Sequence, residues 1–289
     1  MLIFTYLYFN QRPHIYGWES WEPAQSYDKL PKILWTYWDD PDKLPKSVKM
    51  CMESWKKYNP NYEIKLLTKK NYSEYVDIPN RITESPNFND FPARFADLVR
   101  INVLAKYGGV WVDSTTLLKE SLDKWLFPRQ VEFSGFYIDS FTTDKKSPII
   151  ENWFFACIKD SEFMKLWRDE FMKMADYPTV RDYVNSRKDM GINLQKMVNP
   201  EYLAMHVSAQ KVLQIDKYNL DNLILKKAED GPFNYLVYGE WDLKRSLKLA
   251  CKNKKYQYPI MKIRGGERKI LEEGLNSYLS IKNCGWLDP

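Results

Sequence analysis

Residues 91–118 read FPARFADLVRINVLAKYGGVWVDSTTLL. The first half is mostly apolar, which predicts a helix buried against a sheet. Gly108 and Gly109 predict the end of that helix, because a helix C-terminus favours a residue that tolerates positive φ. Residues 110–112 have strand character, and Asp113 stands where the strand ends. Because ligands of open α/β sheets bind beyond the C-terminal ends of strands, Asp113 is the first candidate for chemistry.

Three charged residues, Arg94, Asp97 and Arg100, interrupt this helix at steps of three. Such spacing places neighbours on one side of a helix. Two interpretations are open. The residues form a solvated face with an ion pair, or they form a polar stripe directed at a ligand that Asp113 holds. The second interpretation requires the stripe to lie largely buried in a cleft.

The composition is that of a folded α/β protein. The chain has 289 residues, 44% of them hydrophobic and 28% charged, which allows one large domain or two small ones. A net charge of +5 is too small to indicate nucleic-acid binding, and no nucleic-acid motif is present. It suits an anionic donor or peripheral contact with an anionic membrane surface. The many aromatic residues suit a cleft that stacks on sugars or bases, or an aromatic-rich core.

The cysteines and the N-terminus bear on location. The four cysteines lie far apart without a CxxC pair, so a zinc site is not expected, and a reducing compartment is the simplest inference. Cys51 and Cys157 have the surroundings of small core residues. The opening MLIFTYLYFN is apolar but lacks a basic leader and a cleavage site. We therefore expect a cytoplasmic protein, soluble or at the inner face of the membrane.

Along the chain, residues 1–30 read as an irregular aromatic arm, and residues 31–289 as one domain with a helical C-terminal half. Strands are expected at 32–38, 62–67 and 131–138, and a loop at 77–90. Helices are expected at 45–58, 71–76, 162–174 and 200–213, the last containing His206. The alternation of strands and helices before Asp113 predicts a mostly parallel sheet.

An aspartate at a strand end, followed by Ser114 and Thr115, suits a divalent cation that bridges a diphosphate, or a simple turn. The aromatic end of the first strand, residues 35–38, is a place for a nucleotide base or for core packing. No GxGxxG or P-loop sequence is present, and only two histidines occur, without GxSxG. Dinucleotide binding, P-loop chemistry and Ser-His-Asp hydrolysis are therefore poorly supported, and His206 is interpreted as structural.

Three ordered blocks, LPKILWTYW, FADLVRINVLAKYGGVWVD and, more weakly, IIENWFFA, resemble the capsular polysaccharide synthesis glycosyltransferases. These are related to the glycosyltransferases with a DXD sugar-binding motif. The resemblance implies a GT-A-like α/β fold. It also implies transfer of a sugar from a nucleoside-diphosphate sugar, with a UDP-sugar favoured, to a cell-surface or capsular glycan or a lipid-linked saccharide.

The resemblance also implies roles for residues. Asp97 and Arg100, with Arg94 beside them, would bind the donor sugar, and Asp113 would be the first acid of the DXD motif. The second acid position holds Thr115, so Asp113 and Thr115 would be the ligands of a manganese or magnesium ion. The nucleotide would be bound by the following four residues: Trp35, Thr36, Tyr37 and Lys262.

Asp139 follows a predicted strand and is a candidate base if the anomeric configuration inverts. If configuration is retained, the leaving phosphate itself can take the acceptor proton, so both stereochemical outcomes stay open. Two other functions compete with glycosyl transfer. A sugar-phosphate nucleotidyltransferase would need a glycine-rich phosphate loop after the first strand, where this chain has WTYWDDPD. A non-catalytic glycan-binding module with a degenerate site is compatible with Thr115.

Overall fold

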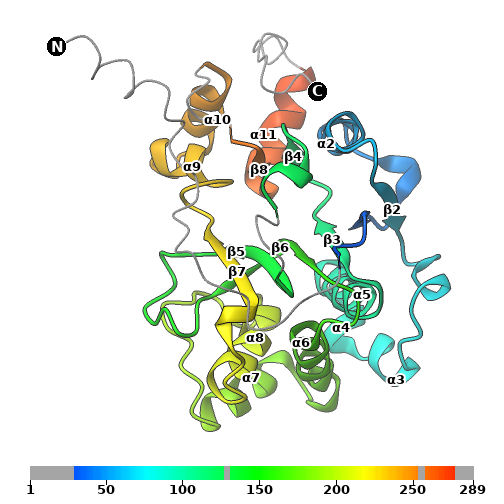
Figure 1. Ribbon diagram of the computed structural model, residues 1–289, viewed down its shortest axis with the longest axis vertical. Coiled ribbons are helices and arrows are strands. Elements are labelled where there is room, and N and C mark those ends of the chain that lie inside the picture. Colours follow the sequence, from blue (N-terminus) through cyan, green and yellow to red (C-terminus); the bar gives the residue numbers. More distant parts are fainter. Residues whose placement is uncertain (1–28, 127–130, 253–257, 277–289) are drawn as a thin grey trace.

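A six-stranded sheet in the order β2-β1-β3-β6-β5-β7 forms the centre of the protein (Figure 1). The computed structural model describes residues 29–126, 131–252 and 258–276. Strand β6 runs antiparallel to both of its neighbours, β3 and β5, whereas the pairs β1–β2, β1–β3 and β5–β7 are parallel. The mostly parallel α/β fold expected from the sequence is therefore confirmed. The strands are β1 (Ile33–Tyr37), β2 (Glu63–Leu67), β3 (Gly109–Val112), β5 (Phe133–Tyr137), β6 (Ile150–Cys157) and β7 (Leu223–Lys227).

Helices cover both faces of this sheet (Figure 1). Side chains alternate between the two faces of a strand, and in β6 the neighbours Phe154 and Phe155 enter two different hydrophobic clusters. The cluster with Phe155 includes α5, α6, α7 and α8, and the cluster with Phe154 includes α2, α9, α10 and α11. The helices are α2 (Lys46–Tyr58), α3 (Asn80–Thr83), α4 (Pro86–Asn89), α5 (Pro92–Tyr107), α6 (Glu162–Met172), α7 (Val180–Asp189), α8 (Ala204–Gln214), α9 (Asn234–Tyr238), α10 (Leu243–Lys252) and α11 (Gly265–Asn276).

The corner between α5 and β3 depends on two glycines. Gly108 ends α5 with φ +65°, and Gly109 follows with φ +95°. A Cβ atom on Gly108 would lie 2.5 Å from the backbone carbon of Ile158, so no side chain fits there. The Gly108 carbonyl also accepts a hydrogen bond from the Trp35 indole at 2.9 Å. The corner therefore fixes where β3 starts, and with it the place of Asp113.

A second, two-stranded sheet joins the chain after Asp113 to the C-terminal part. Strands β4 (Thr116–Leu118) and β8 (Ile260–Lys262) pair antiparallel, with Thr116 opposite Lys262. This pairing brings Lys262, a residue late in the sequence, next to Asp113.

The structure corrects several sequence-based expectations. Residues 77–90 are not a plain loop, because they contain the short helices α3 and α4, and residues 71–76 contain only a 3-10 helix at Tyr72–Glu74. The aromatic arm predicted at residues 1–30 lies almost wholly outside the described residues. Cys51 and Cys157 are buried and free, as expected of small core residues.

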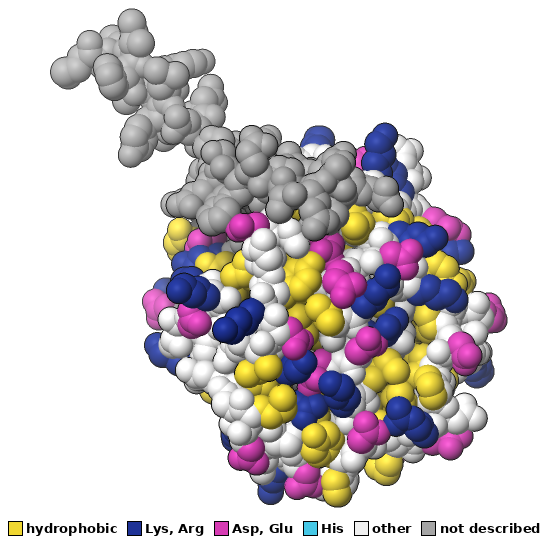
Figure 2. Space-filling view, turned by 60° about the horizontal axis from the view of Figure 1, so that its bottom comes forward, with side chains coloured by type: hydrophobic (Ala, Val, Ile, Leu, Met, Phe, Trp, Pro, Cys, Tyr) yellow, Lys and Arg dark blue, Asp and Glu magenta, His cyan; other side chains and the backbone are white. Residues whose placement is uncertain are grey.

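Within the described ranges, none of the helices has the length and apolar character needed to cross a bilayer. On the face that Figure 2 shows, basic and acidic side chains are interspersed among apolar ones rather than gathered into one basic field.

Candidate functional site

A cavity of about 570 Å³ opens at the C-terminal ends of β1 and β3 and along the first half of α5. Parallel strands bring their C-terminal ends to one edge of a sheet, where ligands of α/β proteins bind. The cavity is lined from six parts of the chain. The lining includes residues 37–40, residues 91–94 with Ala96, Asp97 and Arg100, residues 111 and 113–115, Asn152, residues 202, 203 and 206, and Gly265 with Arg268.

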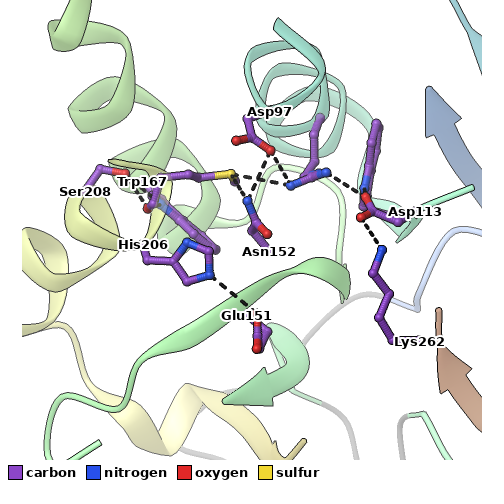
Figure 3. Close-up of polar contacts among 11 residues, drawn as sticks. Asp97, Asp113, Glu151, Asn152, Trp167, His206, Ser208 and Lys262 are labelled. Atoms are coloured by element: carbon purple, nitrogen blue, oxygen red, sulfur yellow. Dashed lines mark hydrogen bonds and ion pairs between the residues drawn. The ribbon is translucent and has the colours of Figure 1, made fainter. Parts of the chain in front are cut away.

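Asp113 lies at the end of β3 and is held by three donors (Figure 3). Its Oδ1 accepts hydrogen bonds from Arg100 at 2.7 Å and from the Trp111 indole at 2.9 Å, and its Oδ2 accepts one from Lys262 at 2.6 Å. Burial acts to raise the pKa of Asp113, but Lys262 and Arg100 outweigh burial and hold that pKa below its usual range. Asp113 is therefore a fixed, ionised carboxylate.

Asp97 lies one turn before Arg100 on α5 and shares its guanidinium. Arg100 Nη1 donates to Asp97 Oδ1 at 2.6 Å, and the Asn152 amide donates to the same oxygen at 3.1 Å. Burial raises the pKa of Asp97 to about 6, although Arg100 acts to lower it. The side chains of Asp97 and Arg100 are only 14% and 5% exposed, so this part of the polar stripe lies in a cleft and is not a solvated face.

Arg94 completes the stripe at the cavity wall. Its guanidinium donates to the backbone carbonyls of Asn87 at 2.8 Å and Glu201 at 3.4 Å, and it stacks over Phe91 at 5.1 Å. Phe91 in turn meets the ring of Tyr202 edge-on, with ring centroids 6.1 Å apart. Arg94 thus fixes an exposed aromatic rim on the cavity, and its contacts with backbone carbonyls give it a structural role as well.

The predicted nucleotide-binding residues separate into two groups. Tyr37 lines the cavity, where its hydroxyl donates to the Asp39 carboxylate, and Trp38 follows it. Trp35 and Thr36 do not line the cavity. Trp35 is a core residue that packs against Tyr75 and Tyr107, and Thr36 is fully buried. Trp35 shares a face of β1 with Tyr37, but it lies two residues further from the C-terminal end of the strand, where the cavity opens.

The candidate base Asp139 is not brought to the cavity. Its carboxylate makes ion pairs with Lys145 and, at 3.0 Å, with Lys227. Strand β6 lies between β3 and the strand that precedes Asp139. Two strand spacings amount to roughly 10 Å, which separates the two strand ends. The position of Asp139 therefore gives no support for a role beside Asp113.

Sequence reasoning missed several residues of the cavity. His206 was interpreted as structural, yet it lines the cavity, with its Nε2 3.5 Å from Glu151 Oε2. Asn152 binds Asp97, and its only sequence signal was a polar residue inside an apolar segment. Arg268 gave no signal at all, because it lies in a basic segment far from Asp113 in the sequence. It stacks over the Trp38 ring at 5.4 Å.

The expected metal ligands do not match the donor set that a divalent cation prefers. A cation that bridges a diphosphate binds one or two carboxylates together with phosphate oxygens and waters, so it needs a carboxylate oxygen that is free to bind it. Both oxygens of Asp113 already accept from cationic side chains, and the Thr115 hydroxyl lies 3.3 Å from Lys262 Nζ. Among the described residues, no group of three or more His, Cys, Asp or Glu side chains is arranged to hold a metal ion. The attraction of Asp113 for a cation, about 4 kcal/mol per unit charge at 4 Å near a protein surface, is opposed by similar repulsion from Lys262.

Comparison with known proteins gives the family. Residues 19–240 match the family described as capsular polysaccharide synthesis protein. This match covers well over half of the chain, and the chain therefore belongs to that family.

Individual relatives are more distant. The O-glycosyltransferase braB of Annulohypoxylon truncatum is 25% identical over 171 residues, which are 51% of this chain and 38% of that protein. The chain thus matches well under half the length of this curated relative. Among solved structures, the glycosyltransferase GlyE of Streptococcus pneumoniae TIGR4 is similar with a TM-score of 0.45 and 12% identity, covering 89% of this chain and 63% of GlyE. The galactosyltransferase LgtC, in complex with donor and acceptor sugar analogs, has a TM-score of 0.42 and 11% identity, covering 88% and 99%.

Proposed function

We propose that this protein is a glycosyltransferase that moves a sugar from a nucleoside-diphosphate sugar to a cell-surface or capsular glycan, or to its lipid-linked precursor. One observation carries the proposal. Asp113, Arg100 and Asp97 form a continuous hydrogen-bonded chain, buried at Arg100 and partly exposed at both aspartates, along one wall of a cavity at the C-terminal edge of the sheet. Membership of the capsular polysaccharide synthesis family supports the same reaction class.

The donor sugar would bind against α5. The side chains of Asp97, Arg100 and Asn152 present oxygen acceptors and N–H donors on one wall, the combination that sugar hydroxyls need. Their mutual hydrogen bonds hold them in place before the sugar arrives. Fixed orientation of the donor at the reacting carbon is a large source of rate acceleration.

The nucleoside diphosphate would lie between β1 and α11. Tyr37 and Trp38 offer ring faces and edges for the base, and a UDP-sugar is the favoured donor. Arg268 lies beside Trp38, and Gly265 brings the first turn of α11 to the cavity. A helix N-terminus and a guanidinium both stabilise phosphate charge, and this charge grows as the diphosphate leaves.

The acceptor would approach the opposite rim. Phe91 and Tyr202 are 40% and 57% exposed there, and both line the cavity. Exposed aromatic rings at the mouth of a polar cavity suit the apolar faces of sugar rings. Which group removes the acceptor proton depends on the stereochemical outcome. The candidate base Asp139 does not line the cavity, whereas Asp97 and Asp113 do.

Release of nucleoside diphosphate from a panel of UDP-, GDP-, ADP- and CDP-sugars tests the proposal. Asp113→Asn removes the negative charge with which both Arg100 and Lys262 pair. We expect turnover to fall on the order of 100-fold, because Arg100 and the donor sugar that it orients would no longer be held in place. Asp139→Asn is the matched comparison, since it also removes a paired aspartate after a strand. It should keep turnover within about twofold.

Equal turnover in wild type and Asp113→Asn would contradict the assignment. Binding of glycans without binding or turnover of any nucleotide sugar would instead favour a non-catalytic glycan-binding module.

A further inference from the structure

Lys262 lies between the two side chains that the sequence presents as metal ligands. Pairing of β8 with β4 places its Nζ 2.6 Å from Asp113 Oδ2, a contact that Figure 3 shows. The same Nζ lies 3.3 Å from Thr115 Oγ1. An ammonium group therefore lies where a cation bound by Asp113 and Thr115 would lie. The two cannot share this position, since they would repel each other and compete for the same oxygens.

The charges around this position already balance. Asp97 and Asp113 carry two negative charges, and Arg100 and Lys262 carry two positive charges, in one connected set of hydrogen bonds. A divalent cation at a diphosphate needs at least one carboxylate that is free to bind it, and both oxygens of Asp113 already accept from cationic donors. The position is thus occupied by the ammonium group of Lys262 and leaves no net negative charge to attract a divalent cation.

Lys262 is also held firmly by its surroundings. Its backbone carbonyl accepts a hydrogen bond from the Tyr235 hydroxyl at 2.8 Å, and its Nζ lies 5.7 Å from the centre of the Trp153 ring. Its side chain is 10% exposed, behind the cavity-lining residues Asp113 and Thr115. An ammonium group has three N–H donors. Within the described part of the chain, the Lys262 ammonium donates to a carboxylate oxygen of Asp113 and to the hydroxyl of Thr115.

We infer that Lys262 takes the place of a divalent cation: it neutralises Asp113 beside the cavity, so that the chain binds the diphosphate of its nucleotide without a metal ion. The inference rests on the proposed function, because it concerns the diphosphate of the same donor. It differs from the expectation of manganese or magnesium drawn from the DXD-like motif. Strand β8 places Lys262 at the position where the motif suggests a metal ion.

Calorimetric titration of the wild-type protein with UDP, GDP, ADP and CDP, in EDTA and in manganese, is the first test. The dissociation constant of the preferred nucleotide should differ less than threefold between the two conditions. Weakening by threefold or more in EDTA would overturn the inference and leave the proposed function standing. No binding of any nucleotide in either condition would overturn both.

Lys262→Gln keeps hydrogen-bonding capacity but removes the charge, and it should weaken nucleotide binding at least tenfold in both conditions. Lys269→Gln changes an exposed lysine on α11 and should leave binding unchanged. If manganese strengthened nucleotide binding by the same factor in wild type and in Lys262→Gln, relative to EDTA, the inference would be wrong.

A reciprocal exchange gives a readout that needs no nucleotide. Thr115→Asp with Lys262→His replaces the ammonium by metal-ligating groups around Asp113, and manganese should then bind, seen as loss of the free-ion signal in electron paramagnetic resonance. Wild type, and Thr115→Asp combined with Lys269→His, should not bind it. Manganese binding to wild type that Asp113→Asn removes would overturn the inference. If the exchange variant fails to fold by circular dichroism, the wild-type titrations still decide.

Discussion

At the scale of single residues, Asp97 and Asp113 respond to pH in opposite ways. Burial raises the pKa of Asp97 to about 6 from 3.8, so the native state binds a proton more readily than the unfolded chain in that interval. Asp97 therefore opposes folding at neutral pH, and this cost disappears as pH falls through 6 towards 3.8. The pKa of Asp113 is lowered, so its pairing stabilises the fold at neutral pH and is lost only in acid.

The same difference predicts a pH dependence of donor binding. Between pH 7 and 5 Asp97 takes up a proton while Asp113 stays ionised, so Asp97 ceases to orient Arg100 and the sugar hydroxyls as a carboxylate. We expect the affinity for the preferred nucleotide sugar to fall roughly tenfold over this interval, with a midpoint near 6. Asp97→Asn should bind more weakly but with a flat profile, because the titrating group is gone. Titration of both proteins at five pH values checks this, and a flat wild-type profile would contradict it.

At the scale of elements, the corner between α5 and β3 leaves no room for a side chain at Gly108. Gly108→Ala should lower the free energy of unfolding by about 2 kcal/mol or more, because it combines strain at positive φ with overpacking against Ile158. Gly191→Ala is the matched control. Gly191 also has positive φ, +88°, but a Cβ there meets nothing within 4 Å, so it should cost less. Urea unfolding measures both, and equal losses would mean that packing at the corner contributes nothing.

The elements also show what a sequence can predict. The segment from α5 to Asp113 was predictable because helix, glycine corner and strand each leave a local signal. Helices α3 and α4 were not, since four residues are too few to show a helical period. Asp139 was proposed from its place after a strand, but strand order depends on long-range pairing, and β6 separates it from β3. Trp35 was proposed from its aromatic character, which suits a core as well as a cavity.

At the scale of the whole molecule, the site exists only because distant segments meet. The small sheet of β4 and β8 holds residues 260–262 beside Asp113. Helix α8 brings His206 to the cavity, and the turn before it brings Tyr202. Lys262 could be proposed from the family resemblance, but its contact with Asp113, across 149 positions, could not be read from any local pattern. The site is therefore a property of the tertiary structure, and we expect ligand binding to slow backbone hydrogen exchange in all of the segments that form it.

Hydrogen–deuterium exchange with mass spectrometry tests this dependence directly. Saturation with the preferred nucleotide sugar should slow exchange in three separate peptides, because each contributes contacts to one ligand: the first turns of α5, residues 113–118, and residues 260–268. Helix α7 packs in the helical half without lining the cavity, so its exchange should not change. Asp113→Asn should lose the protection in all three peptides together, since Asp113 connects Arg100 on α5 to Lys262 on β8. Protection limited to α5 would show that the C-terminal segment lies beside the site without taking part in binding.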